Sequence, residues 1–288
     1  MAAPRFSIVI PTRNRADTLR FSLETCLSQT FDDYEVVVCD NHSTAETREV
    51  VEAAASTKIR YVRSEKSLSM TSNWELAVSQ ATGEFVTVLG DDDGLLPFAL
   101  QEADHLIRTR GARIVHWTGG LYTWPNINIP GDANFLRVPL TRAAKNCKSS
   151  EKIAEVISFR GLHPSDLPMI YTSFVGREVL ESHRNRAGGR IFLTVSPDVY
   201  SAFGCAAVVD NYLSIGVPLG LAGLSGHSNG VACLFPKDQG KASRDFLRVS
   251  AAEGYVSHPT VPAIPVWATP TADAFQRAKE LFFHTMRL

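Results

Sequence analysis

The sequence at residues 6–40 reads FSIVIPTRNRADTLRFSLETCLSQTFDDYEVVVCD, two short apolar runs joined by an amphipathic stretch. Such alternation is typical of βαβ units built around a mostly parallel sheet, and here it continues to residue 117. The predicted strands are residues 6–10, 34–40, 59–64, 85–90 and 113–117, and the predicted helices lie near 16–29, 45–55, 72–81 and 97–110. Ser72 and Glu75 have capping-box spacing at the start of the third helix. The first half therefore predicts an α/β fold.

The composition is that of a folded chain with no marked charge. The 288 residues are 44% hydrophobic and 20% charged, enough for one large core or two modest ones. The formal charge of −1 gives no indication of a nucleic-acid partner. Five scattered cysteines without C-x-x-C spacing favour a reducing compartment.

No segment has the sequence of a membrane span. The apolar run in MAAPRFSIVIP is too short for a signal peptide, and the apolar region 202–224 is interrupted by Asp210, Asn211 and Pro218. We predict a cytoplasmic protein and leave peripheral membrane contact open.

The pattern changes after residue 117. Residues 118–149 predict irregular or antiparallel structure over one face. Helices are predicted near 149–159, 177–184 and 197–209, a strand at 212–220, an extended proline-rich segment at 258–273 and an amphipathic helix near 272–287. We predict one domain over 1–235, divided into halves at 117, and a C-terminal extension over 236–288 that is a candidate for contacts between copies of the chain.

Three adjacent carboxylates, Asp91, Asp92 and Asp93, directly follow the predicted strand 85–90. Like charges near a core need compensation, and a divalent metal supplies it. In an extended loop Asp91 and Asp93 would share a ligand while Asp92 faces away. The alternative is a solvated acidic turn before a new helix.

Polar residues end the other predicted strands as well, and ligands of open parallel sheets bind at the carboxyl ends of the strands. Carboxylate oxygens suit Mg²⁺ or Mn²⁺ bridging to a diphosphate, which points to a nucleoside diphosphate compound. The sequence has neither G-x-x-x-x-G-K-[ST] nor a strand-linked G-x-G-x-x-G, so an ordinary ATPase or dinucleotide site is disfavoured. The predicted site residues at this edge are Pro11, Thr12, Arg13, Asp40, Asn41, Arg63, Asp91, Asp92 and Asp93.

Residues 6–47, together with NWELAVSQATGEFVTVLGDDDGLLP at 73–97, resemble the family-2 glycosyltransferases. The resemblance is strong over 6–105 and weaker over 170–230. It implies a GT-A fold and a metal-dependent, inverting transfer of sugar from a UDP-, GDP- or dTDP-sugar. The implied acceptor is a saccharide or lipid-linked saccharide, in polysaccharide or glycoconjugate biosynthesis, and the implied cofactor is Mn²⁺ or Mg²⁺.

The resemblance also assigns roles to residues of the first half. It implies that Pro11, Thr12 and Arg13 line the nucleobase, that Asp40 contacts base or ribose, and that Asn41 and Asn73 belong to the same site.

The metal-binding register is ambiguous in the sequence. Gly90 stands where most family members begin the D-x-D motif. If the motif is aligned by counting back from Pro97, Asp92 is the metal-binding residue. If the D-x-D pattern is read directly from the sequence, the metal-binding residues are Asp91 and Asp93.

In the second half, Pro197-Asp198 replaces the family's Glu-Asp pair, so the resemblance implies that Asp198 is the base that takes the acceptor proton. The alternative is a first-turn carboxylate that interacts with the helix dipole. His227 is a candidate metal ligand or phosphate contact, and a structural histidine is the alternative. Trp124, in a predicted loop, is a candidate for stacking on the acceptor sugar.

Two other functions stay open. A sugar-phosphate nucleotidyltransferase shares a similar first half but is expected to have a glycine-rich basic loop after its first strand, where this chain reads PTRNRADT. The third interpretation is an inactive sugar-binding or scaffold module.

Overall fold

The computed structural model describes residues 3–127, 131–139, 141–158, 164–226, 246–262 and 268–283. Its first half alternates strands and helices: β1 (Phe6–Thr12), α1 (Ala16–Leu27), β2 (Tyr34–Asp40), α2 (Ala45–Ala53), β3 (Ile59–Arg63), α3 (Met70–Ser79), β4 (Phe85–Val88), β5 (Gly94–Leu95), α4 (Ala99–Arg110) and β6 (Ile114–Trp117). The second half contains β7 (Gly120–Thr123), β8 (Leu136–Arg137), β9 (Ala144–Lys148), α5 (Ser149–Ile157), the 3₁₀ turns η1 (Pro164–Asp166) and η2 (Ile170–Thr172), β10 (Ser173–Gly176), α6 (Arg177–Arg186), α7 (Pro197–Ala207), β11 (Asn211–Ile215), β12 (Gly220–Leu224) and α10 (Ala268–Phe282).

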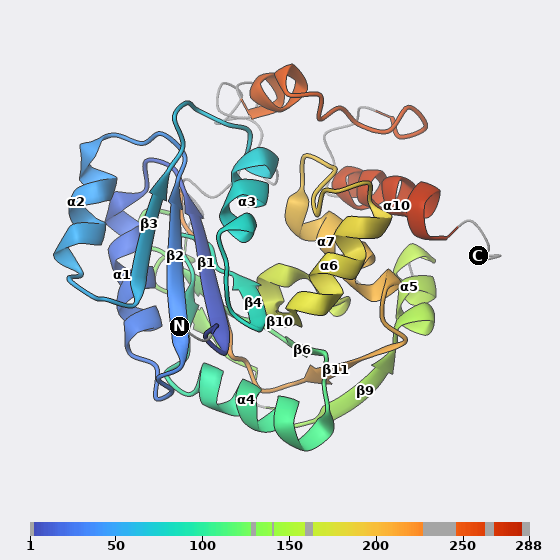
Figure 1. Cartoon of the computed structure of the whole chain (residues 1–288), viewed down its shortest axis with the longest axis horizontal. Coiled ribbons are helices and arrows are strands. Elements are labelled where there is room, and N and C mark those ends of the chain that lie inside the picture. Colours follow the sequence, from blue (N-terminus) through green and yellow to red (C-terminus); the bar gives the residue numbers. More distant parts are fainter. Residues whose placement is uncertain are drawn as a thin grey trace.

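The main sheet has eight strands in the order β3-β2-β1-β4-β10-β6-β11-β9. The pairs β2–β3, β1–β2, β1–β4 and β6–β11 are parallel, whereas β10 is antiparallel to both of its neighbours and β9 is antiparallel to β11. The predicted α/β class is confirmed, and the sheet is mixed because the second half adds the antiparallel strands (Figure 1).

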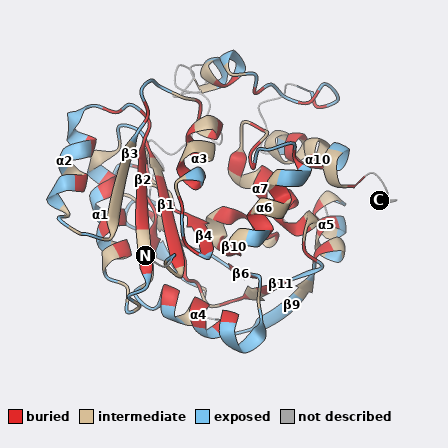
Figure 2. Cartoon of the chain, in the orientation of Figure 1, coloured by how far each residue is buried: buried red, intermediate tan, exposed pale blue. Residues whose placement is uncertain are grey.

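Both faces of the sheet are covered by helices, which explains the continuous apolar runs of its central strands. Along β1, Ile8 and Ile10 pack into one core with α1 and α4, whereas Val9 packs into a second core with α3 and α6. On β2, Val36 packs into the first of these cores and Val37 into the second. The strands β1 and β2 are accordingly buried along most of their length (Figure 2).

The helices of the second half gather beyond β4 and β10, on the side away from α1 and α2 (Figure 1). Tyr200 and Phe203 of α7 pack with Ala274 and Ala278 of α10 in a third core, to which α5 also contributes. The C-terminal helix thus belongs to the core that positions α7. The predicted boundary at residue 235 lies outside the described residues, so the predicted division into domains stays a prediction.

A second sheet has four strands in the order β5-β12-β7-β8. Its strands β7 and β8 lie in the region 118–149 that was predicted to be irregular or antiparallel, whereas β9 of that region joins the main sheet. In the second sheet β12 pairs with β5, directly after the three aspartates, and with β7. The predicted strand at 212–220 is therefore two strands, β11 in the main sheet and β12 in this one. Among the described residues, no helix is long and apolar enough to cross a membrane.

Candidate active site

The carboxyl ends of β1 and β4 meet at one edge of the main sheet, because the two strands are parallel neighbours. Thr12, the last residue of β1, donates a hydrogen bond from Oγ1 to Asp91 Oδ2 over 2.7 Å. The backbone N–H of Arg13 also donates to Asp91, while the Arg13 side chain is exposed. Thr12 and Asp91 are thus brought together as the strand-end argument predicts.

Asp92 is held by two side chains that the sequence analysis did not single out. Arg15 Nη1 lies 3.3 Å from Asp92 Oδ2 and 3.9 Å from Asp91 Oδ1. The hydroxyl of Ser225, just beyond β12, donates to Asp92 Oδ2 over 2.7 Å. Residues 91 and 92 form a turn and not an extended segment, so it is Asp91 and Asp92 that share a cation. The extended geometry expected to place Asp91 and Asp93 on one side is thus not found, and the metal-binding register stays a prediction.

The Asp93 carboxylate stabilises the loop through hydrogen bonds with backbone groups. Its Oδ2 accepts the N–H of Gly90 over 2.8 Å, and its Oδ1 accepts the N–H of Gly223 in β12 over 2.6 Å. Its main-chain carbonyl accepts a hydrogen bond from Ser22 over 2.6 Å. A Cβ on residue 90 would lie 2.5 Å from Asp93 Oδ2, which explains why glycine occupies this position. These contacts favour the register in which Asp92 is the metal residue.

Asp40 ends β2 and is fully buried. Its Oδ1 accepts the N–H of Ser43 over 2.9 Å, and its Oδ2 accepts the Tyr61 hydroxyl over 2.5 Å. Arg63 Nη1 lies 3.7 Å from the same Oδ2.

Three further predicted residues lie around this strand end. The Asn41 amide pairs with both backbone groups of Leu68, over 2.7 and 2.9 Å, and so fixes the loop after β3. Asn73 on α3 is buried, with its Oδ1 3.5 Å from Cys39 Sγ. Pro11 pairs with Cys39 across β1 and β2.

Asp198 lies in the first turn of α7 and is half-buried. Its carbonyl accepts the Ser201 hydroxyl over 2.6 Å, and that hydroxyl in turn accepts the N–H of Ile170 over 3.1 Å. The start of α7 is thereby fastened to η2, which carries Tyr171.

Tyr171 connects the two groups of carboxylates. Its hydroxyl hydrogen-bonds Asp93, and its ring stacks on Trp74 with 6.2 Å between centroids. Burial raises the pKa of Tyr171 well above its usual value, and the charges of Asp93, Asp92 and Asp198 raise it further. The turn η2, which is fastened to the start of α7 through Ser201, thus also contacts the aspartate loop through Tyr171.

The electrostatics of the site follow from burial. Burial raises the pKa of Asp91 to about 6, with the Arg15 guanidinium opposing the shift and the charge of Asp92 adding to it. Burial also raises the pKa of Asp93 to about 7, again with a contribution from Asp92. The pKa of Asp198 is raised by burial and lowered by backbone N–H groups at the start of α7. The candidate base is thus a more basic carboxylate than one in water.

The donor set agrees with a metal held jointly with a substrate. Within the described part of the chain, no group of three or more His, Cys, Asp and Glu side chains could hold a metal ion. Mg²⁺ is usually bound by one or two carboxylates plus substrate phosphates, and not by an all-protein cage. Asp91 and Asp92 supply two hard carboxylates directed at one shared cation, so they fit such a metal.

Two other sequence predictions have different outcomes. His227 lies outside the described residues. Trp124 donates from Nε1 to the carbonyl of Asp92 over 2.9 Å and packs against Phe21 and Tyr122, so it helps to hold the aspartate loop.

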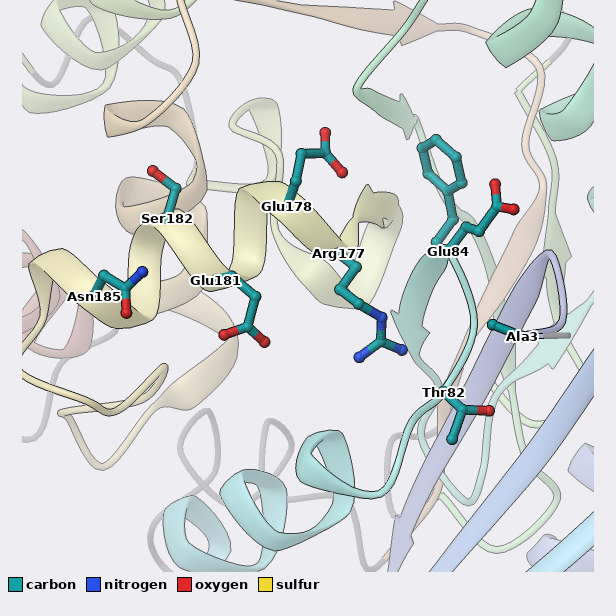
Figure 3. Close-up of a pocket in the computed structure, with 9 residues that line it drawn as sticks. Ala3, Thr82, Glu84, Arg177, Glu178, Glu181, Ser182 and Asn185 are labelled. Atoms are coloured by element: carbon teal, nitrogen blue, oxygen red, sulfur yellow. The ribbon is translucent and has the colours of Figure 1, made fainter.

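A pocket of about 770 Å³ lies elsewhere, between α6 and the turn before β4 (Figure 3). Thr82 and Glu84 of this pocket precede β4, whereas the aspartates follow it, so the two lie at opposite ends of the strand. Glu84, Glu178 and Glu181 make the pocket acidic, and Arg177 is engaged with the carbonyls of Ala81 and Gly83. An anionic diphosphate does not fit this surface.

Comparison with known proteins identifies the family. Residues 7–145 match the model of glycosyl transferase family 2. This part of the chain, just under half of its 288 residues, belongs to glycosyl transferase family 2. The matched residues contain β1 to β7, and with them Thr12, Asp40 and the three aspartates.

One relative is the GalNAc(5)-diNAcBac-PP-undecaprenol beta-1,3-glucosyltransferase of Campylobacter jejuni, which is 35% identical over 100 residues. The match covers 34% of this chain, and it spans about a third of the relative's own length, 32%.

Solved structures show the fold. S. aureus TarS 1-349, in complex with UDP-GlcNAc, matches 98% of this chain and 74% of its own with a TM-score of 0.62 and 16% identity. The mannosyltransferase PcManGT from Pyrobaculum calidifontis, in complex with GDP-Man and Mn²⁺, matches 100% of this chain and 77% of its own with a TM-score of 0.53 and 20% identity. The chain has the GT-A fold, as the resemblance implies.

Proposed function

We propose that this chain is a metal-dependent, inverting glycosyltransferase that moves a sugar from a nucleotide-diphosphate sugar to an acceptor hydroxyl. One observation carries the proposal: the Tyr171 hydroxyl hydrogen-bonds Asp93, and the neighbouring Ile170 N–H donates to the Ser201 hydroxyl, which donates to the carbonyl of the candidate base Asp198. A donor bound at the strand ends would therefore lie beside a carboxylate that can accept a proton.

The relatives suggest the substrate classes. UDP-GlcNAc and GDP-Man are bound in the two solved structures, so a UDP-, GDP- or dTDP-sugar is proposed here as the donor. The Campylobacter enzyme is named for an undecaprenol-linked saccharide, which supports a lipid-linked saccharide acceptor in glycoconjugate or polysaccharide biosynthesis. Such an acceptor would place the site at a membrane surface and calls for peripheral contact with it.

Within the proposed reaction each half of the chain has a separate task. Pro11, Thr12 and Asp40 bind the nucleoside, and Asp91 and Asp92 hold Mn²⁺ or Mg²⁺. A metal held by these two carboxylates would supply positive charge against the charge that develops on the leaving diphosphate. Asp198 accepts the proton of the acceptor hydroxyl as the oxygen attacks the anomeric carbon from the face opposite the diphosphate. A single displacement of this kind inverts the anomeric centre.

The deciding experiment is a panel of UDP-, GDP- and dTDP-sugars, each tested for thermal stabilisation with and without Mn²⁺ and then for transfer to saccharide acceptors. A donor that binds only the folded state raises the melting temperature according to its affinity. We expect one donor class to stabilise the chain in the presence of Mn²⁺ and to be turned over. Stabilisation without transfer or donor hydrolysis would indicate an inactive sugar-binding module. Consumption of a nucleoside triphosphate with a sugar phosphate would indicate a nucleotidyltransferase.

A further inference from the structure

Arg15 is a cation that faces both Asp91 and Asp92. It follows β1 by three residues and lies at the N-cap of α1, yet its guanidinium reaches the aspartate loop after β4. Its Nη1 atom lies 3.3 Å from Asp92 Oδ2, 3.9 Å from Asp91 Oδ1 and 3.1 Å from Ser225 Oγ. Only 15% of the Arg15 side chain is exposed, against 13% of Asp91 and 10% of Asp92.

These contacts form a network of charge-assisted hydrogen bonds. The Ser225 hydroxyl donates to the same Asp92 oxygen that Arg15 approaches, and it accepts from Arg15 as well. Removing one partner of a mostly buried ion pair leaves an uncompensated charge, which is strongly unfavourable. Arg15 therefore compensates the charge of two carboxylates that are mostly buried and so only weakly solvated by water.

We propose that Arg15 is a resident counter-ion that a divalent metal must displace from Asp91 and Asp92 when the site is loaded. The inference rests on the proposed metal role of these two carboxylates. Both cations would use the same carboxylate oxygens, and two positive charges a few Å apart repel strongly at low dielectric. The metal consequently binds at the cost of the Arg15 contacts, and donor-free metal affinity is held down by a side chain of the protein itself.

The test measures Mn²⁺ alone, without donor, by electron paramagnetic resonance of the free ion at constant ionic strength. Arg15→Met removes the competing cation. We expect this variant to bind Mn²⁺ at least about tenfold more tightly than the unsubstituted chain, because the free energy of breaking a mostly buried ion pair exceeds that of a tenfold change in affinity. Arg20→Met is the matched control. Arg20 lies on the same helix over the ring of Phe21, so its loss makes the same change in net charge without touching the carboxylates. We expect the control to change Mn²⁺ affinity by less than about twofold, as screened exposed charges do.

A second variant keeps the proposal testable should Arg15→Met fail to fold. Arg15→Lys keeps the charge but loses the planar fork that contacts Asp92 and Ser225 together, so Mn²⁺ should bind it more tightly than it binds the unsubstituted chain. Added Mn²⁺ should also raise the melting temperature of both Arg15 variants more than that of the unsubstituted chain.

The outcomes separate this inference from the proposed function. If the unsubstituted chain binds Mn²⁺ and the Arg15 variants bind it equally or less tightly, or if Arg20→Met tightens binding as much, the counter-ion role is rejected while the metal-dependent function stands. If no variant binds Mn²⁺ at all, both the counter-ion role and the metal assignment are rejected.

Discussion

At the scale of single residues, three adjacent aspartates have three different surroundings. Asp93 accepts two backbone N–H groups, Asp92 faces Arg15, and Asp91 accepts the Thr12 hydroxyl. The sequence predicts the cluster and its place at a strand end, because both depend on local pattern. It does not predict the division of roles, because that depends on Gly223 and other groups of β12 that lie some 130 residues away in the chain.

This division gives a prediction for two neighbouring variants. Asp92→Asn removes one of the two proposed charged metal ligands, so Mn²⁺-dependent donor affinity should fall by about tenfold or more. Asp91 remains 3.9 Å from Arg15 as a counter-charge, so the fold should lose less stability than it does in Asp93→Asn. Asp93→Asn places an amide NH₂ where a backbone N–H now donates, so it should destabilise the fold by about 1–3 kcal/mol. Calorimetric titration and thermal unfolding of both variants measure the two effects. Equal loss of stability in the two variants would contradict the separation of roles.

A second prediction concerns Asp198, whose pKa is raised by burial. Asp198→Asn keeps the size of the side chain but cannot accept a proton, so transfer should fall by about 10²-fold or more while the donor still binds normally. Rate and binding assays with the variant, and NMR of the product formed by the unsubstituted chain, check the base and the inversion. A variant of normal rate and normal melting temperature, or a product with retained anomeric configuration, would refute the mechanism.

At the scale of elements, local signals locate most helices and strands of the first half but misplace one helix start. Ser72 and Glu75 predict that α3 begins at Ser72, whereas the cap is Ser69, whose hydroxyl oxygen accepts the N–H of Ser72 over 3.1 Å. Ser69 also donates to Glu253 over 2.6 Å, a partner that no local pattern reveals. Strand β12 was likewise not predicted as a separate strand, because its partners β5 and β7 are distant in the chain and no local pattern reveals them.

The contact between β12 and the aspartate loop gives a prediction at this scale. A Cβ on Gly223 would lie 1.7 Å from the carbonyl oxygen of Asp92, so Gly223→Ala should push the loop away from β12 and destabilise the fold by about 1–3 kcal/mol. Mn²⁺-dependent donor binding should weaken with it. Gly119→Ala is the control, because a Cβ there meets nothing within 4 Å. Denaturant unfolding of the two variants compares them, and equal midpoints would show that the loop adapts without cost.

At the scale of the whole molecule, α6, α7 and α10 meet around a buried histidine. His183 of α6 packs against Tyr200 of α7 and Phe282 of α10, and neither ring nitrogen has a hydrogen-bond partner among the described residues. Burial lowers the pKa of His183 to about 3, with the Arg184 charge contributing. The folded chain therefore holds this ring neutral at pH values at which the unfolded chain protonates it.

The consequence is a testable dependence of stability on pH. Because the folded pKa is below the unfolded value of about 6.5, the contribution of His183 is fully present above pH 6.5 and is lost as pH falls toward 3. His183→Leu should remove this part of the acid destabilisation and, by eliminating unpaired buried nitrogens, raise stability at pH 7 by about 1 kcal/mol. Melting curves between pH 7 and 5 for His183→Leu and for exposed His105→Leu make the comparison. Parallel curves for all three proteins would exclude His183 as the cause.

The position of β10 between β4 and β6 also determines when the sheet can be completed during synthesis on the ribosome. β6 ends at Trp117, but the strand that joins it to β4 begins only at Ser173. At ordinary rates of translation the nascent first half therefore waits roughly 3 to 12 s with two unpaired strand edges in its centre. Unpaired edges are templates for pairing with other chains. We expect this interval of translation, before the second half emerges, to be the stage at which the protein depends most on chaperones.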